Sequence, residues 1–164
     1  MNFALALVIL MGSTAFAQVR GDIHDSADYY GARGSNSSKI REACEQTLLE
    51  QKSRLTTVEA AVQAPVNSLT AEASVERRCQ VQGPHGFCQS WYFQCRIDLS
   101  SSIPSLGFVE DDTEKRLGAG RDAECESDRK ELEKDSTVVM DETYSYLTFQ
   151  GIACRTRYIQ VARR

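Results

Sequence analysis

The chain has 164 residues, of which 26% are charged, and its formal net charge is −4. A mildly acidic chain argues against nucleic acid as a default partner, because phosphate backbones bind basic surfaces. Only residues 3–11 form a long unbroken apolar run, and a membrane-spanning helix needs about 20 such residues. We therefore expect no stable membrane insertion once this first segment has been removed.

Residues 1–17 have the features of a signal peptide. The apolar run is followed by Ala15-Phe16-Ala17, which fits a small-x-small cleavage site. The sequence therefore predicts cleavage after Ala17 and a protein that is secreted or periplasmic.

All six cysteines lie after residue 17. An even number of cysteines behind a secretory signal predicts disulfide bonds formed in an oxidising compartment. We expect three bonds that stabilise a core of modest size.

Residues 18–37 are polar, contain glycines and show no sustained periodicity, so they are interpreted as a flexible N-terminal arm. The sequon Asn36-Ser37-Ser38, which would be glycosylated only in a eukaryotic host, spans the end of the arm. Ser37 or Ser38 is then expected to cap a long helix that ends before Pro65. Spacings of three and four place one amphipathic stripe on this helix, made of Ile40, Cys44, Leu48, Gln51, Leu55, Val58 and Val62.

The clearest alternating pattern follows, in residues 75–99. Residues 75–82 and 87–99 predict the two strands of a hairpin around the turn-forming residues 83–86. One face of the second strand is mainly apolar, and we expect it to form the core beneath the long helix. Residues 110–114 are interpreted as a solvated acidic loop and residues 121–135 as a short charged helix. Strands are predicted at residues 137–140, 143–150 and 152–162.

These elements predict an α+β fold in a single domain, residues 38–164. Its antiparallel sheet has about four strands in two hairpins, and one long and one short helix pack on one face. The order helix, strand, turn, strand occurs twice, which suggests half-repeats at residues 38–99 and 119–164. Chance similarity between amphipathic segments is the alternative.

Two disulfide patterns are compatible with this fold, and both pair Cys125 with Cys154. The half-repeats favour Cys44–Cys88 and Cys79–Cys95. Strand geometry favours Cys79–Cys88 across the hairpin and Cys44–Cys95 from helix to strand, because Cys79 and Cys95 point to opposite faces.

The sequence contains no recognisable catalytic, cofactor or metal site. Its only histidines, His24 and His85, are interpreted as exposed side chains. Cys79, His85, Cys88 and Cys95 do not have a familiar zinc-ligand spacing. Arginines near the predicted hairpins instead suggest a candidate face for an anion or a partner, formed by Arg155, Arg157, Tyr158, Arg77 and Arg96. The alternative is a solvated sheet face that discourages aggregation.

The leading interpretation is a secreted or periplasmic non-catalytic binding module with a protein or glycan partner. A small secreted hydrolase with an unrecognised site is the first alternative. The second is a protease inhibitor or toxin-like effector that presents the turn at residues 83–86.

Overall fold

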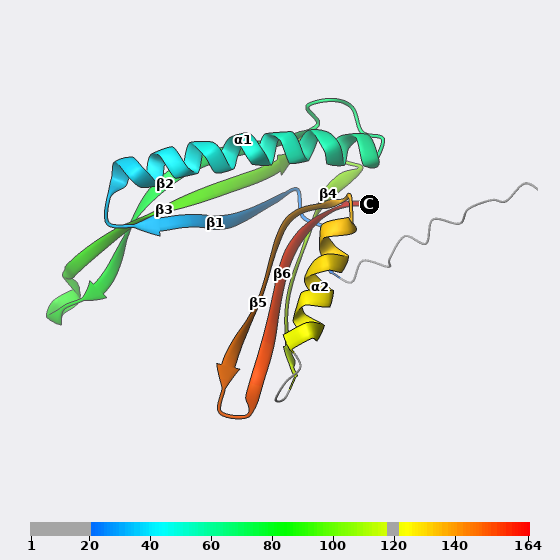
Figure 1. Cartoon of the computed structure of the whole chain (residues 1–164). Coiled ribbons are helices and arrows are strands. Elements are labelled where there is room, and N and C mark those ends of the chain that lie inside the picture. Colours follow the sequence, from blue (N-terminus) through cyan, green and yellow to red (C-terminus); the bar gives the residue numbers. More distant parts are fainter. Residues whose placement is uncertain (1–20, 118–121) are drawn as a thin grey trace, which may run out of the picture.

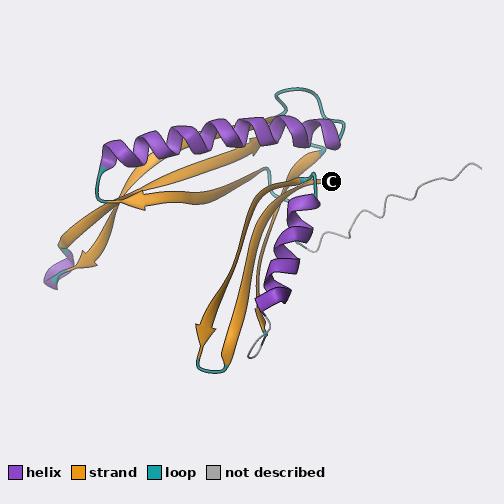
Figure 2. Cartoon of the chain, viewed as in Figure 1, coloured by secondary structure: helices purple, strands orange, loops and turns teal. Residues whose placement is uncertain are grey.

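The computed structural model describes residues 21–117 and 122–164, so the predicted signal peptide lies outside the described residues. The described part is α+β and contains two helices, a short 3₁₀ turn and six strands in two three-stranded antiparallel sheets (Figures 1 and 2). The predicted class is confirmed, but the prediction of one sheet of about four strands is wrong.

The first sheet consists of β1 (Ser26–Gly34), β2 (Leu69–Gln82) and β3 (Cys88–Ser101), in the order β1-β3-β2. The helix α1 (Ser37–Ala61) connects β1 to β2 and covers one face of this sheet (Figure 1). The central strand β3 carries Cys95, Ile97 and Leu99, which are fully buried. The inner part of the apolar alternation, from Phe93 to Leu99, therefore forms the core beneath the long helix.

The second sheet has the same connectivity. β4 (Leu106–Arg116), α2 (Asp122–Lys134), β5 (Val138–Thr148) and β6 (Gly151–Arg163) follow in that order, and the sheet order is β4-β6-β5. Each half is thus strand, helix, strand, strand, with the last strand in the centre. This shared unit begins one strand earlier than the predicted half-repeats.

The two missed strands, β1 and β4, account for the wrong strand number. Residues 26–34 belong to the segment interpreted as a flexible arm, yet they pair with β3 from Ser26↔Ser100 to Gly34↔Phe93. Residues 110–114, interpreted as an acidic loop, pair with β6. Pattern analysis recognises a strand by the alternation of apolar and polar residues along it. A strand whose residues are nearly all charged, and are stabilised by charged partners on the neighbouring strand, lacks this alternation.

The cap of α1 is Asn36, one residue before the nearer of the two predicted caps, Ser37. The Asn36 side chain accepts a hydrogen bond from the Lys39 amide at 3.1 Å, as an N-cap residue does. The predicted stripe faces the core: Ile40, Cys44, Gln51, Leu55 and Val58 are buried, and Leu48 and Val62 pack against them.

The structure has the disulfide connectivity that strand geometry favours: Cys44–Cys95, Cys79–Cys88 and Cys125–Cys154. Two of these bonds join a helix to the central strand of its own sheet. Cys95 therefore corresponds to Cys154 in the other half, and the Cys44–Cys88 bond favoured by the half-repeats does not form. Three disulfides are consistent with an extracellular or periplasmic protein.

One carboxylate holds the loop that connects α1 to β2. Glu59 is only 4% exposed, and its Oε1 accepts a hydrogen bond from the Leu69 amide at 2.8 Å while Oε2 accepts one from the Asn67 amide at 3.2 Å. Asn67 has a φ of 64°, so this loop needs support from outside its own backbone.

We therefore expect Glu59→Ala to lower the free energy of unfolding by about 2–4 kcal/mol, because two backbone N–H groups lose their acceptor. Glu59→Gln keeps one carbonyl acceptor, so a loss of about half that size is expected. Urea denaturation measures both, with Glu45→Ala on the exposed side of α1 as the control. Equal stability of the Ala variant and the control would show that the carboxylate does not hold the loop.

Candidate interaction surface

The distal ends of the two long hairpins carry most of the exposed apolar surface. The hairpins point away from the core in different directions (Figure 1). Of the eight large apolar side chains that are exposed among the described residues, six lie on these distal parts: Val81, Phe87, Trp91, Tyr144, Leu147 and Phe149.

The two hairpin segments themselves contain no Asp, Glu, Lys or Arg, although neighbouring residues place Arg77 over Trp91, Glu114 at Tyr146 and Arg116 at Gln150. Neither residues 79–95 nor residues 143–154 include one, although 26% of the whole chain is charged. Aromatic enrichment together with loss of charge is typical of the centre of a protein interface. An ordinary solvated surface would carry charged residues at about the frequency found in the whole chain.

The first of these regions is the end of the β2–β3 hairpin, residues 79–92, which we call the clamped tip. β1 ends opposite Phe93, so beyond this point β2 and β3 continue as a two-stranded ribbon. A ribbon of two strands is marginally stable in water by itself. The Cys79–Cys88 disulfide closes this ribbon covalently, with 5.6 Å between the Cα atoms.

The turn of the clamped tip is compact. The Gly83 amide donates a hydrogen bond to the Phe87 carbonyl at 2.7 Å around the short 3₁₀ turn Pro84–Gly86 (Figure 2). His85 and Gly86 both have positive φ, of 65° and 82°. This turn presents Phe87, which is 75% exposed.

Trp91 lies further back on the ribbon and is 42% exposed. The Arg77 guanidinium lies over its ring, 4.2 Å from the ring centre, which fixes the indole by a cation–π contact. The tip therefore presents large apolar side chains in held positions, which lowers the entropy lost when a partner binds.

Sequence reasoning assigned this aromatic strand face entirely to the core. That assignment is correct for Phe93, Cys95, Ile97 and Leu99 but wrong for Phe87 and Trp91, because the hairpin is longer than the helix that covers it (Figure 1). The signal that could have found the exposed part is the 17-residue run without a charge.

The structure does not bring the residues of the predicted arginine face together on one face of a sheet. Arg77 and Arg96 point to opposite faces of the first sheet, and Arg155 and Tyr158 point to opposite faces of the second. Tyr158 lines a cavity under α2 instead.

Two arginines of that face, Arg96 and Arg155, are paired with carboxylates. Arg96 contacts Asp28, Glu76 and Asp98, and Arg155 makes two hydrogen bonds to Asp112, at 2.9 and 2.7 Å. The bond from Arg155 lowers the pKa of the Asp112 carboxyl below its ordinary value. Arg157 lies opposite Asp112 on one side and Glu142 on the other. Two of these five carboxylates, Asp28 and Asp112, come from the strands that the sequence analysis missed. The sheet faces therefore carry mixed charges.

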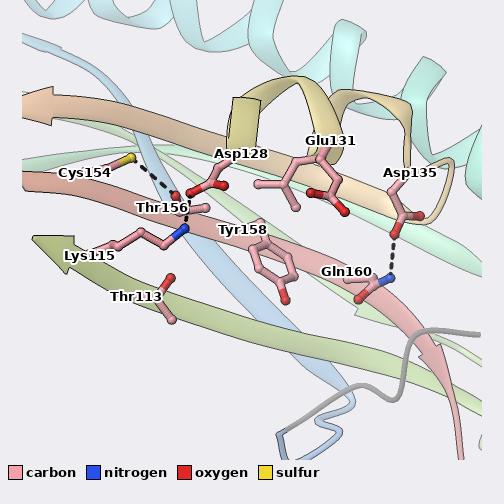
Figure 3. Close-up of a pocket in the computed structure, with 10 residues that line it drawn as sticks. Thr113, Lys115, Asp128, Glu131, Asp135, Cys154, Thr156, Tyr158 and Gln160 are labelled. Atoms are coloured by element: carbon pink, nitrogen blue, oxygen red, sulfur yellow. Dashed lines mark hydrogen bonds and ion pairs between the residues drawn. The ribbon is translucent and has the colours of Figure 1, made fainter. Parts of the chain in front are cut away.

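The cavity between α2 and the second sheet, with a volume of about 330 Å³, is shown in Figure 3. Lys115 pairs with Asp128 at 3.0 Å across it, and Gln160 donates to Asp135 at 3.0 Å. Its only cysteine, Cys154, is in a disulfide, and no histidine lines it. The polar groups thus largely satisfy one another, and the cavity offers no nucleophile paired with a base.

A second hollow, between α1 and β5, is part of the structural link between the sheets. The Tyr29 hydroxyl donates to Gln51 Oε1 at 2.9 Å, and Gln51 Nε2 donates to the Val139 carbonyl at 3.0 Å. These bonds join β1, α1 and β5. Burial raises the pKa of Tyr29 to about 12, because the phenolate would lose its hydration.

This burial predicts a loss of stability at alkaline pH. The raised pKa means that the unfolded chain loses the Tyr29 proton first, near pH 10, so stability falls as the pH rises from about 10 to about 12. We expect a decrease of about 2–3 kcal/mol in the free energy of unfolding over this window. Tyr29→Phe should lack this part of the decrease in denaturation curves recorded at pH 9 to 12. An unchanged pH profile in that variant would contradict the assignment.

Comparisons with known proteins add no relative: no family model, curated protein or solved structure matches the chain. No helix among residues 21–117 and 122–164 is long and apolar enough to cross a membrane. The same residues contain no group of three or more potential metal ligands. The clamped tip is therefore the feature of the described structure that most resembles a binding surface.

Proposed function

We propose that this chain is a secreted or periplasmic, non-catalytic binding protein that contacts a protein partner through the clamped tip. The observation that carries this proposal is the exposure of Val81, Phe87 and Trp91 on a disulfide-closed ribbon without charges. The predicted signal peptide, cleaved after Ala17, and the three disulfides support the compartment.

A protein partner fits the tip better than a glycan does. Sugars are commonly held against the open face of an aromatic ring, and one face of Trp91 is already covered by Arg77. An apolar pocket that receives Phe87 and the edge of Trp91 would bury surface that is otherwise exposed to water.

The shape of the tip also favours one narrower function, that of a protease inhibitor or toxin-like effector. The turn at residues 83–87 protrudes, is closed by Cys79–Cys88 and is internally hydrogen-bonded. A rigid protruding loop is suited to insertion into a cleft, because little entropy is lost on binding. The identity of the captured partner separates this function from a general binding role.

Quantitative capture from the medium or periplasm of the native cells tests the proposal. Immobilised wild-type protein should retain a defined partner, and Phe87→Ser/Trp91→Ser should lose it. The matched control is Leu49→Ser/Val66→Ser, which removes two exposed apolar side chains elsewhere and should retain the partner. Equal capture by both double variants would exclude the tip as the binding surface.

A further inference from the structure

The outer edge of β5 differs from the other three sheet edges. An edge strand presents unpaired backbone N–H and C=O groups, and proteins normally protect it with charges, bulges or short length. β5 pairs only with β6, so its other side is unpaired within the described structure.

The other edges are protected in these ways. β1 has nine residues and a register shift between Tyr30 and Arg33. β2 carries Glu72, Glu76, Arg77 and Arg78, and β4 has only one uncharged residue in residues 110–116.

The sequence of the distal half of β5 provides no such protection, although Glu126 and Arg129 of α2 line a hollow beside residues 143–145. Residues 143–148 read Thr-Tyr-Ser-Tyr-Leu-Thr, without a charge, a proline or a glycine. Threonine and tyrosine favour extended strands. Leu147 is 84% exposed at the same edge.

We propose that β5 pairs antiparallel with β5 of a second copy of this chain, so that two second sheets join into one six-stranded sheet. A two-fold axis through Ser145 makes the segment self-complementary. Tyr144 then lies opposite Tyr146 of the other copy, and Thr143 lies opposite its Leu147.

The two tyrosines select this register, because it forms two Tyr144–Tyr146 pairs, and it also keeps like charges apart. Glu142 lies opposite Thr148 of the second copy, so the acidic pair Asp141 and Glu142 never meets its own counterpart. Opposed like charges would destabilise the ladder, whereas aromatic cross-strand pairs stabilise it. A second copy therefore supplies a strand that pairs with the segment without opposed like charges, which favours it over an unrelated strand.

Such a dimer would present two clamped tips from one assembly. Its ladder is short compared with stable dimer interfaces, which bury about 1,200 Å² or more. We therefore expect a dissociation constant on the order of 1–100 μM. Two linked tips would raise the apparent affinity for a partner with repeated binding sites.

Sedimentation equilibrium of the secreted protein tests self-pairing. The average mass should rise from that of the monomer toward that of the dimer between about 1 and 500 μM. Ser145→Lys places two like charges on the two-fold axis, so its dissociation constant should be at least about 10-fold higher. Thr113→Lys adds the same charge to the same face at the opposite edge, β4, and should behave as wild type.

A cysteine introduced by Ser145→Cys tests the register without relying on a charge. Residues directly opposite in an antiparallel pair have Cα atoms about 4.5–5.5 Å apart, within the range of a disulfide. Mild oxidation should link two copies through position 145, whereas Thr113→Cys should give no such dimer. Peptide mapping confirms that the three native disulfides are intact.

Three outcomes would overturn the proposal. The first is a protein that is still monomeric at 500 μM. The second is an equal increase of the dimer dissociation constant in Ser145→Lys and Thr113→Lys. The third is a dimer in which oxidation of the Ser145→Cys variant forms no bond between the two copies. The wild-type protein could also be monomeric while its Ser145→Lys variant no longer captures a partner from the native medium. The edge of β5 would then bind a different protein, which also overturns self-pairing. None of these results depends on the clamped tip.

Discussion

Replacing Cys44 and Cys95 together by alanine is expected to lower the free energy of unfolding by about 4 kcal/mol. The bond spans 51 residues, the largest separation of the three, so its loss frees the most chain entropy in the unfolded state. Both sulfurs are also buried between α1 and the first sheet. Guanidinium denaturation of the double variant measures the change.

The stability lost on removing each of the other two disulfides can be compared with this value. Cys125 and Cys154 are 29 residues apart and Cys79 and Cys88 only 9, so losses of about 3.5 and about 2.5 kcal/mol are expected. If removal of Cys79–Cys88 proved the most costly, the tip would contribute to the folded core, contrary to its position beyond α1.

Trp91→Ala is expected to weaken partner binding by about 30- to 1,000-fold, which corresponds to about 2–4 kcal/mol. Trp91 combines a large apolar ring with a position fixed by Arg77, and tryptophans at the centre of an interface commonly carry this much of the binding energy. Surface plasmon resonance with the captured partner measures the change, and it should be mainly in the dissociation rate.

Stability provides the control for this loss of affinity. Trp91 lies on the ribbon beyond the end of β1, so thermal unfolding of the variant should resemble that of wild type. Leu49→Ala, on the exposed side of α1, should leave the affinity unchanged. A folded Trp91→Ala variant with wild-type affinity would show that the indole does not contact the partner.

The long helix and the hairpin could be predicted because apolar residues repeat with the period of each element. Ile40, Cys44 and Leu55 mark one side of a helix, and Cys95, Ile97 and Leu99 mark one side of a strand. These residues face a single core, so tertiary contacts reinforce the local pattern.

β1 and β4 could not be predicted in the same way, because their stability comes from residues distant in the sequence. Asp112 lies in a run of acidic residues, which is typical of a loop. Its partner Arg155 is 43 residues away in the sequence. Tyr29 is buried by Gln51 on a helix that follows it in the sequence. The pattern within one segment contains no information about partners that are distant in the sequence.

The candidate site was only partly predictable for a related reason. The sequence predicted the hairpin, and the Cys79–Cys88 alternative already placed a bond across it. The boundary between covered and exposed strand depends on where α1 begins and where β1 ends, which is a property of the assembled fold. Phe93 and Trp91 are two residues apart on the same face, but only Phe93 packs against the core.

Site-specific photocrosslinking tests the clamped tip most directly. A photoreactive phenylalanine analogue replaces Phe87, and the control places it at Leu49, which is similarly exposed on α1. After irradiation in the medium or periplasm of the native cells, position 87 should give a covalent adduct of one defined mass and position 49 should give none. The absence of an adduct at position 87, or the same adducts from both positions, would contradict the proposal that this protein binds its partner through the clamped tip.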